Sequence, residues 1–201
     1  MVQQIEAVIF DMGGVILRSD DLTPREKLAQ RFGLSREQLE ELVFYNDSAA
    51  LATIGKIDEK DHWKVVCNTL KVSEEERTDF EAAFWQGDRL DNTLINFLRS
   101  LRPQYKTGLL SNAWTGTRDT LLRIQACMDA FDVSIFSYEV GLAKPDAAIY
   151  REILKRLGVE APAAIFLDDN LSNVESAAAL GMHAIRFLNQ QQAIQDIRAL
   201  L

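Results

Sequence analysis

Acidic and hydroxyl side chains directly follow three of the short apolar runs in this sequence. They are Asp11, Ser111-Asn112 and Asp168-Asp169. If the runs are neighbouring parallel strands, their carboxyl ends share one edge of a sheet, and these side chains converge there. Converging carboxylates repel one another unless a cation lies among them, and a set of oxygen ligands favours Mg²⁺. The pattern therefore predicts a magnesium site at that edge.

Two further features suit a phosphorylated ligand. Asp11 is followed by Met12-Gly13-Gly14, and small residues in such a turn let a ligand approach the backbone closely. Lys144 lies before Pro145 and a predicted helix, where its ammonium could reach an anion bound beside the metal. A carboxylate nucleophile, a hydroxyl donor, a lysine and a divalent metal together predict phosphoryl transfer through an aspartyl-phosphate.

The elements that would position these residues alternate between strands and helices. Apolar runs without polar alternation are typical of strands buried on both faces of a parallel sheet. They cover residues 7–10, 108–110, 133–136, 163–167 and 183–187. Helices are predicted to begin after N-caps at Asp91, Asp146 and Ser172, and the last two to end at Gly158 and Gly181. The alternation predicts a doubly wound, Rossmann-like α/β fold.

The stretch 18–90 is different, because it contains no apolar run typical of a strand. It carries three capping signatures, each followed by apolar residues at helical spacing. They are Thr23-Pro24-Arg25-Glu26, Ser35-Arg36-Glu37-Gln38 and Ser73-Glu74-Glu75-Glu76. We therefore predict a small all-helical cap, residues 18–90, inserted after the first strand of a core formed by residues 1–17 and 91–201. Trp63, Phe84 and Trp85 are predicted to form the core of this cap.

Composition and charge limit the partners of the protein. The 201 residues include 22 Lys and Arg against 30 Asp and Glu, a formal net charge of −8. Because no basic stripe is visible, we expect neither nucleic acid nor a membrane surface as a partner. A small phosphorylated metabolite suits a site that is locally positive. The absence of a signal-like start and of a long apolar run, together with two cysteines predicted to be buried free thiols (Cys67 and Cys127), predicts a cytoplasmic protein.

The motifs resemble those of the haloacid dehalogenase (HAD) superfamily. The matching segments occur in the family's order and span about the whole predicted core. They are Val8-Ile9-Phe10-Asp11-Met12-Gly13-Gly14-Val15, Leu109-Leu110-Ser111-Asn112, Lys144-Pro145, and Ile165-Phe166-Leu167-Asp168-Asp169-Asn170 with Asn173. The helical insertion is similar to that superfamily's C1-type cap, and the whole is similar to its sugar-phosphate phosphatases.

The resemblance implies catalytic and substrate-binding roles for four residues. Asp11 would be the nucleophile. Ser111 would donate a hydrogen bond to the transferred phosphoryl group, and Lys144 would balance the charge on that group and on the nucleophile. Asn112 would contact the substrate or orient these groups, and Asn173 would be an orienting residue beside them.

The resemblance also implies a Mg²⁺ site. Asp11 and Asp169 would bind the metal directly, and the backbone carbonyl of Gly13 would supply a further ligand. Asp168 would lie in the inner shell or act through a water molecule.

Gly13 is the main departure from the family pattern, because phosphatases of the family usually carry a second Asp there that protonates the leaving group. Losing a general acid or base lowers the rate by roughly 10²–10⁴-fold. Three explanations compete. The leaving group needs little protonation, as in a sugar 1-phosphate or an acyl phosphate; another residue or the substrate supplies the proton; or the reaction is not phosphate-ester hydrolysis.

The leading prediction is a Mg²⁺-dependent phosphatase that hydrolyses a small phosphorylated metabolite, sugar phosphates included. One alternative is a carbon–halogen hydrolase with the same nucleophile, Asp11. The 2-haloacid dehalogenases of the superfamily also lack the second Asp, but they need no metal, so the pair Asp168-Asp169 favours the metal-dependent branch. The other alternative is a catalytically weak domain that binds a phosphorylated ligand or a partner protein.

Overall fold

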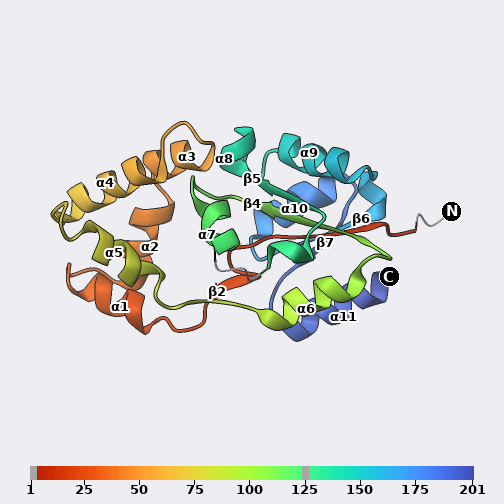
Figure 1. Ribbon diagram of the computed structural model, residues 1–201, viewed down its shortest axis with the longest axis horizontal. Coiled ribbons are helices and arrows are strands. Elements are labelled where there is room, and N and C mark those ends of the chain that lie inside the picture. The colour runs from red at the N-terminus through yellow and green to blue at the C-terminus, as the bar shows by residue number, and fades with distance from the viewer. Residues whose placement is uncertain (1–3, 124–126) are drawn as a thin grey trace.

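The computed structural model describes residues 4–123 and 127–201, so residues 1–3 and 124–126 of the predicted core lie outside the described residues. Its centre is a five-stranded parallel sheet with the strand order β5-β4-β1-β6-β7 (Figure 1). The strands are β1 (Ala7–Phe10), β4 (Lys106–Ser111), β5 (Val133–Phe136), β6 (Ala164–Asp168) and β7 (His183–Arg186). All five apolar runs form strands, with bounds that differ from the prediction by two residues at most.

Helices cover both faces of the sheet, which confirms the doubly wound fold. They are α6 (Asn92–Leu101), α7 (Thr117–Arg123), α8 (Ser137–Val140), α9 (Ala147–Leu157), α10 (Leu171–Ala179) and α11 (Gln190–Leu200), with 3₁₀ turns at Met128–Ala130 and Ala161–Ala163. Side chains alternate between the faces of a strand. Val8 and Phe10 of β1 therefore pack in the core cluster of α6 and α11, whereas Ala7 and Ile9 pack in that of α9 and α10.

The register of the sheet aligns the strand ends that carry polar residues. Phe10 lies opposite Leu109 of β4 and Leu167 of β6. The next position brings Asp11 beside Asp168, and Ser111 follows one position further along β4. The strands therefore deliver these side chains to one edge of the sheet.

Two of the three predicted N-caps of the core helices are confirmed, and the third is wrong. The carboxylate of Asp91 accepts a hydrogen bond from the backbone N–H of Leu94, and that of Asp146 accepts one from Ala148. Ser172, however, lies inside α10, and the N-cap is Asn170, whose side chain accepts from the Ser172 N–H. Asn caps a helix as well as Ser does, and Asn170 lies nearer to the end of β6.

The cap end of the molecule contains five helices. They are α1 (Thr23–Gln30), α2 (Arg36–Phe44), α3 (Asp47–Thr53), α4 (Glu59–Leu70) and α5 (Arg77–Trp85), which lie beside one another at the left of Figure 1. As predicted, Trp63 and Phe84 are buried in their common core, and Trp85 packs against it. The capping box at Ser35 is also confirmed. The signature at Thr23 is not a side-chain cap, because Asp21 accepts from the Thr23 N–H instead.

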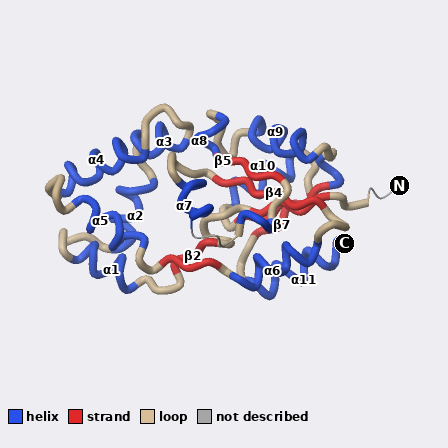
Figure 2. The backbone as a smooth tube through the Cα atoms, in the orientation of Figure 1, coloured by secondary structure: helices blue, strands red, loops and turns tan. Residues whose placement is uncertain are grey.

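A short antiparallel ribbon, which the sequence did not predict, joins the cap to the sheet. It consists of β2 (Leu17–Ser19) and β3 (Asp88–Leu90), the separate strand segment beneath α7 in Figure 2. Arg18 of β2 forms an ion pair of 2.8 Å with Asp91, which also caps α6. Three-residue strands carry too little apolar pattern to be recognised, and their pairing joins residues about seventy positions apart in the chain.

Cys67 and Cys127 are buried free thiols, as predicted. Within residues 4–123 and 127–201, no helix has both the length and the apolar content needed to cross a membrane.

Candidate active site

Three carboxylates meet at the carboxyl edge of the sheet. Asp11, Asp168 and Asp169 each place a carboxylate oxygen within 4.8 Å of the other two. Asp11 is 7% exposed and Asp168 is fully buried, whereas Asp169 lies at the surface of the cluster. The structure thus brings together the three acidic residues whose convergence was predicted from their positions at strand ends.

Lys144 lies between two of these carboxylates. Its Nζ atom is 2.6 Å from Oδ1 of Asp11 and 2.7 Å from Oδ2 of Asp168, and its side chain is 1% exposed. The predicted proximity of Lys144 to Asp11 is therefore observed. The two carboxylates outweigh burial and raise the pKa of the Lys144 ammonium, so Lys144 is charged.

The charges at the site do not balance. When all three carboxylates are ionised, they and the one ammonium leave an excess of two negative charges. Burial, opposed by the attraction of Lys144 and reinforced by the charge of Asp168, raises the pKa of Asp11 to about 7. Burial and Asp168 also raise the pKa of Asp169. Carboxylate oxygens with an excess of two negative charges fit a small divalent cation such as Mg²⁺.

The three carboxylates are not equally free to bind a metal. Both oxygens of Asp168 already accept hydrogen bonds: Oδ2 from Lys144 and Asn173, and Oδ1 from Asn173 and the N–H of Asn170. Asp11 and Asp169 are therefore the residues best suited to touch a cation. Asp168 suits the role of holding Lys144 and Asn173 in place.

The two glycines after β1 have different roles. Gly14 has a φ of +76°, and a Cβ at this position would collide with the carboxylate of Asp169. Gly14 is therefore needed so that the carboxylate of Asp169 can reach the site. From the sequence, the small residues of this turn were expected only to let a ligand approach the backbone. Gly13 is exposed and lies outside the left-handed region, and a Cβ there would meet nothing within 4 Å. Space is therefore open at the position where the resemblance predicts a second Asp.

Asn112 is engaged with the backbone of Lys144. Its Oδ1 accepts from the Lys144 N–H at 2.8 Å, and its Nδ2 donates to the Lys144 carbonyl at 2.9 Å. These two bonds give Asn112 a positioning role, and a contact between Asn112 and substrate stays a prediction. Ser111 is 3% exposed at the end of β4, where its hydroxyl donates only a long 3.4 Å bond to the Asn112 carbonyl.

Two residues that support the site were missed from the sequence. The buried hydroxyl of Tyr150 donates to the backbone carbonyl of Asn173 at 3.0 Å. Ser176 donates to the carbonyl of Pro145 at 2.6 Å. Asn173 and Ser176 are three residues apart on α10, and a helix brings such a pair to one face. That spacing could have indicated a supporting role for Ser176 from the sequence. Tyr150 belongs to an otherwise apolar helix face, so the sequence held no such indication for it.

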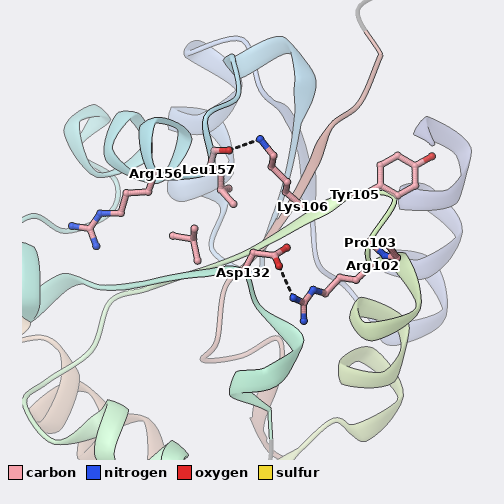
Figure 3. Close-up of a pocket in the computed structure, with 8 residues that line it drawn as sticks. Arg102, Pro103, Tyr105, Lys106, Asp132, Arg156 and Leu157 are labelled. Carbon is pink, nitrogen blue, oxygen red and sulfur yellow. Dashed lines mark hydrogen bonds and ion pairs between the residues drawn. The ribbon is translucent and has the colours of Figure 1, made fainter.

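A hollow of about 370 Å³ lies at the opposite edge of the sheet, where β4 and β5 begin. Figure 3 shows that Lys106, Arg102 and Asp132 among its charged side chains are already paired, and Arg156 pairs with Glu152 at 2.7 Å. Lys106 donates to the carbonyl of Leu157 at 2.7 Å, and Arg102 pairs with Asp132 at 2.6 Å. This hollow is thus separate from the carboxylate cluster, and these contacts stabilise the start of the strands and the end of α9.

Comparison with known proteins identifies a family. A model described as haloacid dehalogenase-like hydrolase matches residues 5–181. A sesquiterpene phosphatase of Aspergillus oryzae is 26% identical, with 100% of this chain and 99% of that protein aligned. A phosphorylated carbohydrates phosphatase of Thermotoga maritima is also 26% identical, over 98% and 90% of the two chains.

Some relatives are much longer than this chain. The alignment with mouse acyl-CoA dehydrogenase family member 10 is 42% identical over 71 residues, which is 35% of this chain and 7% of that protein. The alignment with a drimenol cyclase of Aspergillus calidoustus is 32% identical and covers 54% of this chain and 21% of that protein. This chain therefore spans less than a quarter of either relative.

Solved structures share the fold. A HAD-like hydrolase from Porphyromonas gingivalis superposes with a TM-score of 0.78 at 22% identity, covering 98% of both chains. A HAD family enzyme from Bacteroides thetaiotaomicron, in complex with magnesium and inorganic phosphate, gives a TM-score of 0.75 at 20% identity over 90% of this chain and 93% of that one. At these identities the likeness concerns the architecture alone.

Proposed function

Because the chain belongs to the haloacid dehalogenase-like hydrolases, we propose that it is a Mg²⁺-dependent phosphatase acting on a small phosphorylated metabolite. The observation that carries the proposal is the cluster of Asp11, Asp168 and Asp169 around Lys144, with its excess of two negative charges. The named activities of the Aspergillus oryzae and Thermotoga maritima relatives support phosphate-ester hydrolysis. We place the enzyme in the cytoplasm, with no nucleic acid as partner.

In the proposed mechanism, a carboxylate oxygen of Asp11 attacks the phosphorus in line with the leaving oxygen. The P–O bond to the leaving group breaks, and an aspartyl-phosphate forms. Water then attacks the phosphorus and releases inorganic phosphate, which returns the carboxylate of Asp11. The Ser111 hydroxyl and the Lys144 ammonium stabilise the charge on the phosphoryl oxygens.

The metal would be held by Asp11 and Asp169, with the carbonyl of Gly13 as a further ligand. When bound, Mg²⁺ supplies the positive charge that keeps Asp11 ionised near neutral pH and offsets the charge on the phosphoryl group. Asp168 takes part through Lys144, whose Nζ it holds 2.7 Å away.

Asp169→Ala tests the metal assignment. We expect at least about a tenfold rise in the Mg²⁺ concentration needed for half-maximal activity, because even outer-shell residues commonly contribute about 10–100-fold to metal affinity. Thermal stability in EDTA should change little, since the raised pKa of Asp169 means that its charge is not favoured in the metal-free fold. A variant that is fully active in EDTA would remove Asp169 from the metal site.

Gly13 is the basis for a proposal about the substrate. Without an acid at this position, the enzyme suits phosphates whose leaving group departs with little protonation, such as anomeric sugar phosphates and acyl phosphates. We therefore expect wild-type rates to depend steeply on the pKa of the leaving group, with simple alkyl phosphates hydrolysed slowly.

Gly13→Asp should flatten this dependence. The new side chain has space, since a Cβ at this position meets nothing within 4 Å. We expect alkyl phosphates to gain about 10²-fold or more in rate, because the new carboxyl protonates the departing oxygen. Gly13→Ala is the matched control, with the same Cβ and no acid. A wild-type enzyme insensitive to leaving-group pKa would instead mean that another residue already supplies the proton.

A single turnover in water labelled with heavy oxygen distinguishes the proposal from carbon–halogen hydrolysis. With enzyme in excess over an aryl phosphate, the label should appear in the released phosphate and not in the carboxylate of Asp11. In a dehalogenase, water attacks the carboxyl carbon of the ester intermediate, so the label enters Asp11. Labelled Asp11, read by mass spectrometry of the peptide, would therefore overturn the aspartyl-phosphate mechanism.

A further inference from the structure

One side chain of the sheet domain lies inside the core of the cap. Trp114 follows β4 by three residues, yet it is 8% exposed and belongs to the cap's apolar cluster. Every other buried member of that cluster comes from α1 to α5. The loop that carries Trp114 leads into α7, which lies between the cap helices and the sheet in Figure 1.

The contacts of Trp114 within the cap are specific. Its indole Nε1 donates to the Thr53 hydroxyl at 3.2 Å, and Thr53 donates in turn to the carbonyl of Ala49. Its ring centroid lies 4.4 Å from that of His62 and 6.1 Å from that of Trp63. The cap therefore holds Trp114 with a hydrogen bond to α3 and with two rings on α4.

The neighbours of Trp114 in the loop reinforce this attachment. Thr115 accepts a hydrogen bond from the Glu59 N–H at 2.8 Å, at the first residue of α4. On the other side, the N–H of Ala113 donates to the hydroxyl of Ser137 at 2.9 Å, and that hydroxyl donates to the Ala113 carbonyl. The loop is thus fixed to the cap at one end and to the sheet domain at the other.

The sheet end of the loop is part of the candidate active site. Asn112 lies two residues before Trp114 and clamps the backbone of Lys144 through both ends of its carboxamide. Lys144 contacts Asp11 at 2.6 Å. A short series of direct contacts and one peptide segment therefore connects the proposed nucleophile to the core of the cap.

We propose that Trp114 is a positioning residue that makes the geometry of Lys144 depend on the docking of the cap. When the cap holds Trp114, the loop holds Asn112, and Asn112 fixes the ammonium beside Asp11. This inference rests on the proposed phosphatase function. Its alternative is that Trp114 only adds apolar packing, which would affect stability and leave turnover unchanged.

The test compares Trp114 with another tryptophan, Trp85, that packs against the same cluster. Trp85 packs on the rings of Trp63 and Phe84 and meets the ring of Trp114 edge-on at 6.3 Å, but its chain segment leads to β3 instead of the active site. Trp114→Leu and Trp85→Leu should both lower the melting temperature. Only Trp114→Leu should lower kcat, by about tenfold or more, because small displacements of catalytic groups are that costly. KM should change by less than about threefold, since neither variant removes a residue that is proposed to bind the phosphoryl group.

A conservative series keeps the test informative if the leucine variant folds poorly. Trp114→Phe retains a ring in the cap and should keep most of the wild-type kcat. Thr53→Val removes the acceptor of the indole N–H together with the hydrogen bond from Thr53 to the Ala49 carbonyl. We expect it to lower kcat by about two- to threefold. All assays are run with the full chain, Mg²⁺ and an aryl phosphate, well below each melting temperature.

The outcomes distinguish this inference from the proposed function. Equal loss of kcat in Trp114→Leu and Trp85→Leu, or unchanged kcat in a destabilised Trp114→Leu, would overturn the positioning role while phosphatase activity stands. A folded wild-type protein that releases no phosphate would overturn the proposed function and this inference with it. Selective loss of kcat in the Trp114 variants, with partial retention in Trp114→Phe, is the result expected.

Discussion

Asp11→Asn is expected to lower phosphatase turnover by at least about a thousandfold, because an amide is a poor nucleophile and removing a nucleophile rarely leaves more activity than that. The side chain keeps its size, and the raised pKa of Asp11 shows that its charge is not favoured in the metal-free fold. We therefore expect the fold to survive, which circular dichroism and thermal unfolding in EDTA can check.

The matched control for this variant is Asp61→Asn. Asp61 lies on the surface of α4 and pairs with Lys64 across one helical turn. The same chemical change there should leave both turnover and stability nearly unchanged, because exposed pairs contribute little. If Asp11→Asn retained turnover within about tenfold of wild type, Asp11 would not be the nucleophile.

Lys144→Met is expected to produce the largest loss of stability among single substitutions at the site. Methionine has a similar length, but it removes the only ammonium between Asp11 and Asp168 and leaves two buried carboxylates uncompensated. Removing one partner of a buried ion pair lowers the free energy of unfolding by about 3–5 kcal/mol. Turnover should fall as well, since Lys144 stabilises the charge on the phosphoryl group.

The stability loss of Lys144→Met should depend on pH. A carboxyl whose pKa is raised by folding binds more protons in the folded state, so stability falls as the pH rises through the interval between its unfolded and folded pKa values. For Asp11 in the wild type this interval runs from 3.8 to about 7, and loss of the ammonium extends it upward. Urea unfolding in EDTA should therefore show a larger deficit at about pH 8 than at about pH 6.

Lys106→Met is the control for this measurement. Lys106 donates to the carbonyls of Leu157 and Gly158 at the end of α9. These hydrogen bonds go to backbone carbonyls and not to carboxylates. We expect a loss of no more than about 1 kcal/mol, without the pH dependence. If Lys144→Met were as stable as Lys106→Met at both pH values, the buried ion-pair arrangement would be wrong.

The strands and the candidate site were accessible from the sequence because each motif combines a local signal with a simple rule. An apolar run followed by a polar residue marks the end of a buried strand, and parallel strands place their ends on one edge. The rule placed Asp11, Ser111 and Asp168 together although they are about a hundred and fifty residues apart at the extremes. The roles of these residues in catalysis stay predictions.

The features that escaped prediction depend on contacts between distant segments. Gly14 is required by the carboxylate of Asp169, which lies on another strand end. Trp114 looks like an ordinary loop aromatic until the cap encloses it. The pairing of β2 with β3 rests on three residues a side, too few for a periodic pattern. In each case the deciding partner is remote in sequence, so the local pattern holds no information about it.

The most direct test of the central claim is phosphate release by the wild-type protein from a panel of sugar phosphates, acyl phosphates, nucleotides and an aryl phosphate. Each is measured with Mg²⁺, with EDTA, and with Mg²⁺ restored after EDTA. We predict release with Mg²⁺, fastest for the anomeric and acyl phosphates, loss of release in EDTA, and recovery when the metal is restored. A folded protein that releases no phosphate from the panel, while it releases halide from a 2-haloacid in EDTA, would contradict the account.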